Sequence, residues 1–190
     1  MKYQIILASQ SPRRQQILRE MGFRFTVKIL DTDESYPNTL PVHRVALHLA
    51  EKKADNYTSV LQDDEVVITA DTTVVIEERI LGKPENLEEA RVMLQQLSGN
   101  MHEVITGVCI STKQSRHAFD DTTKVWFRDL DPTEIDHYIH TYRPFDKAGS
   151  YAIQEWIGLI GIEQIQGSYF NVVGLPAEKL YKTLKAIKVF

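Results

Sequence analysis

The segment from Ser9 to Arg14 places two serines, a proline and two arginines close together. A strand that feeds a serine-rich turn into a helix with Pro12 at its first position leaves unpaired N–H groups at the positive end of the helix dipole. Such an end binds anions, and arginine matches phosphate oxygens with paired donors. The hydroxyls of Ser9 and Ser11, together with Arg13 and Arg14, therefore predict a phosphate site. The alternative is an ordinary capped helix with solvated arginines.

Asp71 follows the apolar run Val66–Ala70 and precedes a second one, Val74–Ile76. A carboxylate at the end of a buried strand has to be paired, solvated by a cleft or bound to a cation. Strand ends are also where α/β folds place their sites. Asp71 is therefore a candidate catalytic or metal-binding residue, and the alternative is an aspartate that only forms a turn.

Two lysines and a glutamate complete the candidate residues. Lys53 falls on the apolar stripe of a helix expected over residues 42–56, so its ammonium reaches either solvent or a polar cleft. Lys83 is held in the stiff Gly82–Pro84 loop, which is compatible with a phosphate contact. Glu34 lies in an acidic segment and is either a metal-binding carboxylate or part of a surface loop.

The elements that must position these residues alternate between β-rich runs and amphipathic segments, which predicts one α/β domain over residues 1–190. Expected strands are 4–8, 66–70, 74–76, 102–112, 119–128 and two within 150–166. Expected helices are 12–21, 42–56, one capped by Asn86, one opened by Asp131 with its partner Glu134, and a terminal one opened by Leu175–Pro176.

The composition excludes several classes of protein. The chain has 190 residues, 43% apolar and 25% charged, with 22 Lys and Arg against 26 Asp and Glu, for a net charge of −4. These values are typical of a globular domain, and an acidic chain with few basic clusters is a poor nucleic-acid binder. No apolar run has the length of a membrane span. The single Cys109 gives no sign of an oxidising compartment, so we expect a cytoplasmic protein.

Seven short motifs follow one another along the chain: Leu7–Arg14, Ala70–Thr72, Gly82–Pro84, Leu97–Gly99 with His102 and Thr106–Val108, Asp146–Gly149, Tyr151–Gln154, and Gly167–Tyr169 with Val173–Pro176. In this order they resemble the Maf family of nucleoside triphosphate pyrophosphatases. The resemblance implies a curved mixed β-sheet with flanking helices and two lobes around a cleft, similar to the inosine triphosphatase fold. It also implies hydrolysis of a nucleoside triphosphate to the monophosphate and pyrophosphate, with Mg²⁺ or Mn²⁺.

The resemblance also assigns roles to residues. Asp71 corresponds to the proton acceptor of the family, and with Glu34 it is the expected metal ligand. Residues expected to line the substrate site are Ser9, Ser11, Arg13, Arg14, Glu34, Lys53 and Lys83, and those expected to select the substrate are Arg13, Thr72 and Gln154. The rival role is a nucleotide-sensing protein of septum formation without significant turnover. A homodimer is one assembly that the sequence leaves open.

Gln154 is the residue expected to recognise the base. The Tyr-x-Ile-Gln motif resembles the branch of the family that acts on dTTP and UTP, whereas the branch acting on 7-methyl-GTP has a glutamate near this point. A carboxamide offers an acceptor and donors, which match the N3–H and O4 of uracil or thymine. A glutamate only accepts, which suits the adjacent N–H groups of guanine. We therefore expect Gln154 to select pyrimidines.

Overall fold

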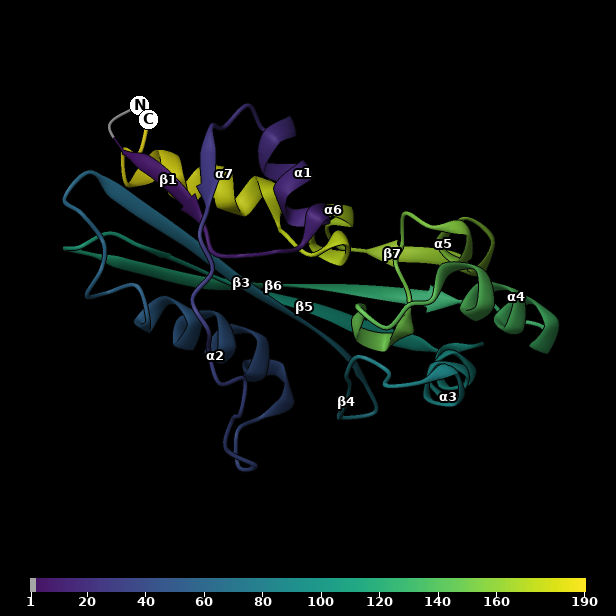
Figure 1. The fold of residues 1–190 in the computed structure, drawn as a ribbon. Coiled ribbons are helices and arrows are strands. Elements are labelled where there is room, and N and C mark those ends of the chain that lie inside the picture. The colour runs from purple at the N-terminus through teal and green to yellow at the C-terminus, as the bar shows by residue number, and fades with distance from the viewer. Residues whose placement is uncertain (1–2) are drawn as a thin grey trace. The chain divides into compact units, whose positions relative to one another are not determined.

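The computed structural model describes residues 3–190 (Figure 1). Its strands are β1 (Gln4–Leu7), β2 (Phe25–Val27), β3 (Glu65–Ile76), β4 (Arg79–Leu81), β5 (Met101–Ser111), β6 (Arg116–Phe127) and β7 (Ile162–Gln166). Its helices are α1 (Pro12–Glu20), α2 (Val42–Asp55), α3 (Leu87–Leu97), α4 (Pro132–Tyr142), α5 (Trp156–Gly161), α6 (Tyr169–Val173) and α7 (Ala177–Ala186), with a short 3₁₀ helix, η1 (Ala148–Ser150).

All seven strands belong to one mixed sheet with the order β2-β1-β3-β5-β6-β7, and β4 pairs with β3 outside this path. β1 is parallel to both β2 and β3, whereas β3 with β4 and β6 with β7 are antiparallel. The expected mixed α/β sheet with flanking helices is therefore confirmed. No helix among residues 3–190 is long and apolar enough to cross a membrane.

The chain forms two compact units, although the expectation of a single domain over 1–190 stays a prediction. The first unit takes in the chain up to Asp71 together with Thr106–Asp121 and Gly174–Phe190. The second takes in Thr72–Ile105 and Thr122–Val173. Because the boundaries fall inside β3, β5 and β6, each of these strands contributes residues to both units.

In the first unit, helices cover both faces of the strands. α2 and α7 lie on opposite sides of β3 (Figure 1). α2 packs closely on its face because Ala50 and Ala54 are small and meet the buried Cys109 of β5. The buried Thr69 hydroxyl donates to the Ala50 carbonyl at 2.6 Å. This bond ties β3 to α2 about one turn before Lys53.

In the second unit, helices α3 and α4 begin where the sequence predicts. The Asn86 side chain accepts from the N–H of Glu89 at 3.0 Å, and Asp131 and Glu134 form a capping box. The apolar faces of both helices enter the core of this unit, which includes Leu94, Ile135 and residues of β3, β5 and β6.

The strands differ from the prediction in two places. The stretch from Val66 to Ile76 is one strand, so Asp71 lies within β3 and not at a strand end. The β-branched Thr72 and Thr73 after it favour extended backbone and continue the strand. Of the two strands expected within 150–166, one is confirmed as β7, whereas the residues before it form the end of η1 and then α5. Only Ile162–Gln166 finds a partner, on β6, and the sequence analysis also missed β2, β4 and α6.

His102 is a buried histidine of the second unit that should make stability depend on pH. Its Nε2 lies 2.7 Å from the Tyr151 hydroxyl, and its ring stacks on Phe127. No atom of the described residues hydrogen-bonds to its Nδ1. Burial lowers the pKa of His102 from 6.5 to about 3. The folded protein therefore keeps this ring neutral where the unfolded chain protonates it.

We expect His102 to destabilise the protein progressively as the pH falls from about 6.5 toward 3, because the unfolded state then binds one more proton. The slope is about 1.4 kcal/mol per pH unit. Urea unfolding of wild type and His102→Gln between pH 7.5 and 5 measures it, and the slope should be shallower in the variant. Tyr151→Phe is the control, because it removes the hydrogen bond and keeps the imidazole. Equal slopes for wild type and His102→Gln would contradict the assignment.

Candidate functional site

The turn between β1 and α1 is organised by its two serines. Ser11 is the N-cap of α1, and its hydroxyl accepts from the N–H of Arg14 at 3.4 Å. The buried Ser9 hydroxyl accepts from the N–H of Ser11 at 3.2 Å. Pro12 occupies the first turn, as predicted. The half-buried Arg13 follows it on α1. The predicted strand, turn and capped helix are therefore confirmed.

Arg14 connects this turn to two other segments of the first unit. Its Nε donates to the carbonyl of Gly174 at 2.8 Å, and its Nη1 donates to the carbonyl of Ala70 at 3.0 Å and to the Ser9 hydroxyl at 3.4 Å. Burial lowers the pKa of Arg14, and the nearby Asp71 carboxylate opposes that effect. Arg14 thus fixes the backbone beside Asp71 and adds positive charge there.

Lys53 joins the two candidate carboxylates. Its ammonium donates to Oδ2 of Asp71 and lies 2.8 Å from Oε1 of Glu34. The side chains of Lys53 and Asp71 are 17% and 16% exposed, whereas that of Glu34 is 57% exposed. The lysine therefore reaches into a polar cluster and not out to solvent. Because the cluster is partly desolvated, these charges interact more strongly than surface ion pairs do.

The remaining predicted residues belong to the second unit. Thr72 follows Asp71 on β3 and is half-buried, and Lys83 is exposed in the loop after β4. The carbonyl of Gly82 accepts from the N–H of Gly149 at 3.0 Å, which ties the Lys83 loop to η1. Gln154 is exposed just before α5.

A buried network holds the backbone around Gln154. The Tyr138 hydroxyl of α4 donates to Oε2 of Glu155 and accepts from the N–H of Ala152 at 3.2 Å. The buried Lys147 lies 3.3 Å from Oε1 of Glu155. Burial, with the neighbouring Glu155, raises the pKa of the Tyr138 hydroxyl, which stays protonated as a donor. Sequence reasoning missed this network, because its members come from separate segments with no shared spacing.

The carboxylates suit a magnesium-type cation bound together with a substrate. Within residues 3–190 no group of three or more His, Cys, Asp or Glu side chains could hold a metal ion by itself. Mg²⁺ usually takes one or two carboxylates and completes its shell with water and substrate phosphates. Asp71 and Glu34, drawn to one ammonium, match that donor set. We therefore expect a divalent cation to bind here only when substrate oxygens complete its coordination shell.

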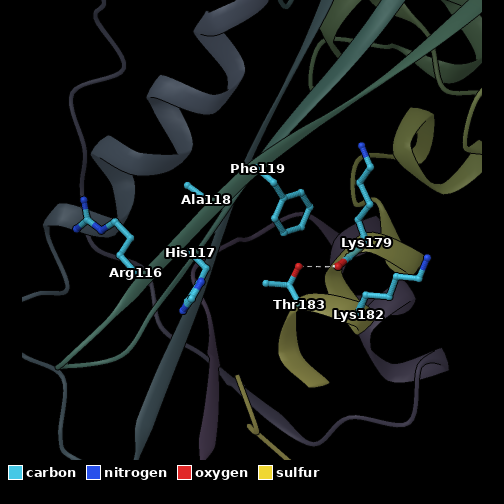
Figure 2. Close-up of a pocket in the computed structure, with 7 residues that line it drawn as sticks. All are labelled: Arg116, His117, Ala118, Phe119, Lys179, Lys182 and Thr183. Carbon is cyan, nitrogen blue, oxygen red and sulfur yellow. Dashed lines mark hydrogen bonds between the residues drawn. The ribbon is translucent and has the colours of Figure 1, made fainter. Parts of the chain in front are cut away.

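A separate pocket of about 550 Å³ lies between β6 and α7 in the first unit (Figure 2). Its lining is basic, but its cations are already paired: Arg116 lies 2.7 Å from Asp55, and Lys179 lies 2.5 Å from Asp121. The Thr183 hydroxyl donates to the carbonyl of Lys179 at 2.8 Å, the dashed line in Figure 2. None of the residues predicted to bind substrate lines this pocket.

In the first unit of this α/β protein, Lys53, Arg14 and the carboxylates of Asp71 and Glu34 lie near the N-terminus of α1. Such a combination of charges suits a polyphosphate bound together with a divalent cation. The profile of the family described as Maf-like protein matches residues 4–187. The chain belongs to the Maf family, and the resemblance found in its motifs is confirmed.

Curated relatives cover nearly the whole chain. A protein of Phocaeicola vulgatus named dTTP/UTP pyrophosphatase is 50% identical, over 98% of this chain and 97% of its own length. Proteins of the same name from Porphyromonas gingivalis and Flavobacterium johnsoniae are 50% and 43% identical, over 94% and 96% of their lengths and 97% and 98% of this chain. Among solved structures, the Staphylococcus aureus Ham1 protein is similar with a TM-score of 0.46 and 16% identity, over 66% of this chain and 72% of that one.

Proposed function

We propose that this protein hydrolyses dTTP and UTP to the nucleoside monophosphate and pyrophosphate, and so removes these nucleotides from the pool. The observation that carries the proposal is Lys53 bound to both Asp71 and Glu34 in a member of the Maf family. The names of the relatives supply the substrates. We expect the protein to act in the cytoplasm, on a small-molecule substrate, with no nucleic acid or membrane as partner.

In the proposed mechanism, water attacks the α-phosphorus, the bond from that phosphorus to the oxygen bridging to the β-phosphorus breaks, and pyrophosphate leaves. Asp71, held by Lys53, takes the proton of the attacking water as a general base. The four negative charges of the triphosphate meet Lys53, Arg13 and Lys83, and the hydroxyls of Ser9 and Ser11 donate to its oxygens. Asp71 and Glu34 would hold the divalent cation, which supplies charge neutralisation and polarises water when bound.

Arg14 has a supporting part in this scheme. Because its Nε and Nη1 donate to Gly174, Ala70 and Ser9, we propose that it orients the backbone next to Asp71 while its charge attracts the phosphates. Thr72 and Arg13 are proposed to contribute to substrate choice with Gln154.

The test of the function is the product formed. Purified protein incubated with MgCl₂ and dTTP or UTP should release pyrophosphate and the monophosphate, measured by ³¹P NMR. Release of orthophosphate would identify a phosphatase instead. No product from any nucleoside triphosphate, with Mg²⁺ or with Mn²⁺, would support the sensing role over the enzymatic one.

Gln154→Glu should shift the substrate preference toward 7-methyl-GTP. The carboxylate cannot donate to O4 of a pyrimidine, and leaving one polar group unpaired costs about 1–3 kcal/mol, or roughly 5- to 150-fold. The ratio of kcat/KM for dTTP to that for 7-methyl-GTP measures the shift. Gln164→Glu, at an exposed position of β7, makes the same chemical change and is the control. An unchanged ratio in Gln154→Glu would remove Gln154 from base recognition.

A further inference from the structure

The segment that carries Glu34 is bound on one side by Lys52, the neighbour of Lys53 on α2. The Lys52 ammonium donates to Oδ2 of Asp33 at 2.9 Å, to the carbonyl of Ser35 at 2.8 Å and to the Ser35 hydroxyl at 3.3 Å. Asp33 and Ser35 also bond each other, through Ser35 N to Asp33 Oδ1 at 3.0 Å and Ser35 Oγ to Asp33 Oδ2 at 2.5 Å. Glu34 is thus flanked by two residues that one ammonium holds.

The C-terminal end of α2 binds the preceding part of the same segment. Asn56, the C-cap of α2, donates through Nδ2 to the carbonyl of Asp31 at 2.8 Å and to the Thr32 hydroxyl at 2.7 Å. The buried Tyr57 hydroxyl donates to the carbonyl of Lys28 at 2.5 Å. Lys52 in the last turn of α2, the C-cap Asn56 and then Tyr57 therefore bind successive parts of one segment, which runs in the opposite chain direction.

This segment needs such contacts because it has no regular structure of its own. Residues 28–37 form neither helix nor strand, and Glu34 is mostly exposed. An unrestrained side chain on such a segment samples many positions, and ordering it on binding reduces affinity.

We propose that Lys52 and Asn56 are positioning residues, which hold the segment 31–35 so that the Glu34 carboxylate lies beside Lys53 and Asp71. The two adjacent lysines then have different tasks, since Lys53 contacts the reacting cluster and Lys52 orders the segment beside it. The proposal rests on the proposed function, because it assigns Glu34 to the bound cation and phosphates.

Lys52→Met and Asn56→Leu test it, because each removes the donors while keeping much of the side-chain volume. Loss of residues that orient metal ligands typically weakens metal affinity by 10- to 100-fold. We expect the Mg²⁺ concentration for half-maximal turnover of dTTP to rise about 10-fold, with kcat at saturating Mg²⁺ reduced much less. Lys52→Arg should recover most of the loss. Lys113→Met, which breaks an exposed lysine–aspartate pair with Asp63 at 3.1 Å, should change nothing.

A double-mutant cycle with Glu34→Gln separates positioning from a general effect. If Lys52 acts through Glu34, then Lys52→Met in the Glu34→Gln background should change the Mg²⁺ requirement less than about 2-fold. A full 10-fold change in that background would overturn the proposal. So would a wild-type Mg²⁺ requirement in Lys52→Met itself.

Hydrogen exchange tests the positioning without turnover. In Lys52→Met and Asn56→Leu, the amides of residues 31–35 should exchange faster while those of β3 keep their protection. Unchanged exchange in residues 31–35 would overturn the proposal even if the enzyme is active. Faster exchange in a protein that releases no pyrophosphate would confirm that these residues order the segment, while the proposed function, and with it a role in that reaction, would fail.

Discussion

Asp71→Asn is expected to reduce the turnover of dTTP by about 10²- to 10⁴-fold, which is the usual contribution of a general base. Asparagine has nearly the same shape, so β3 should keep its position. An amide does not accept a proton near neutral pH, and it binds a divalent cation more weakly than a carboxylate does. Loss of the base falls on the chemical step, so at saturating Mg²⁺ kcat should decrease far more than KM increases.

Two measurements separate the chemical step from nucleotide binding in Asp71→Asn. Pyrophosphate release under single-turnover conditions reports the chemical step, and calorimetry with a non-hydrolysable dTTP analogue reports binding. Asp64→Asn is the matched control, since Asp64 is an exposed aspartate of the same unit whose side chain accepts from Nε2 of Gln4 at 2.7 Å. Near-normal turnover in Asp71→Asn would refute its role as proton acceptor, and loss of nucleotide binding would reassign Asp71 to ground-state recognition.

The parts of this protein that the sequence could predict are those decided by neighbouring residues. A serine before a proline predicts a capped helix, and the Asp131–Glu134 pair predicts a capping box, because each cap is completed within one turn. The same local logic located the turn at Ser9–Arg14, which we propose to bind phosphate. Such features need no knowledge of what packs against them.

The errors occur where distant packing decides the structure. The stretch that follows Ser150 is rich in Ile and Tyr, and this pattern fits either strands or a short buried helix. In the folded protein the backbone at Gly158 packs closely on Ile153, since a Cβ there would lie 1.9 Å from the carbonyl oxygen of Ile153. That approach allows α5 to begin against the preceding backbone. A single sequence does not reveal it.

The candidate site could be predicted as a set of residue types and not as a spatial arrangement. The periodicity of α2 placed Lys53 on an apolar stripe, but whether its ammonium meets solvent or Asp71 depends on how α2 lies on β3. Lys52 and Asn56 were not singled out at all, because a lysine and an asparagine at the polar end of a helix are ordinary surface residues. Their significance comes from the irregular segment that they bind.

The close packing of α2 on β5 should make the free energy of unfolding sensitive to substitution of Gly107. Gly107 of β5 lies directly under α2: a Cβ at this position would lie 2.4 Å from both Cα and N of Leu47. These are backbone atoms, so no rotamer change relieves the contact and the helix itself must move. Gly107→Ala is expected to destabilise the protein by about 3 kcal/mol, at the upper end of the usual cost of overpacking. That corresponds to a decrease in Tm of roughly 6–12 °C.

Gly82→Ala is the matched control. A Cβ at Gly82 has no heavy atom of the described residues within 4 Å, and the backbone there does not require a positive φ. This change should therefore be neutral or stabilising by up to about 1 kcal/mol, because alanine reduces the entropy of the unfolded chain. Equal Tm values for Gly107→Ala and Gly82→Ala, measured by calorimetry, would contradict the close approach of α2 to β5.

The same substitution connects stability to the site. Because α2 carries Lys53, a helix displaced from β5 also moves the ammonium that bridges Asp71 and Glu34. Displacements of about 1 Å in catalytic groups can cost 10²-fold in rate. Gly107→Ala should therefore reduce pyrophosphate release even at temperatures well below its Tm, where the variant is folded and every proposed site residue is present. Full activity in a destabilised Gly107→Ala variant would contradict this connection, because Lys53 would then keep its contacts with Asp71 and Glu34 although α2 has moved.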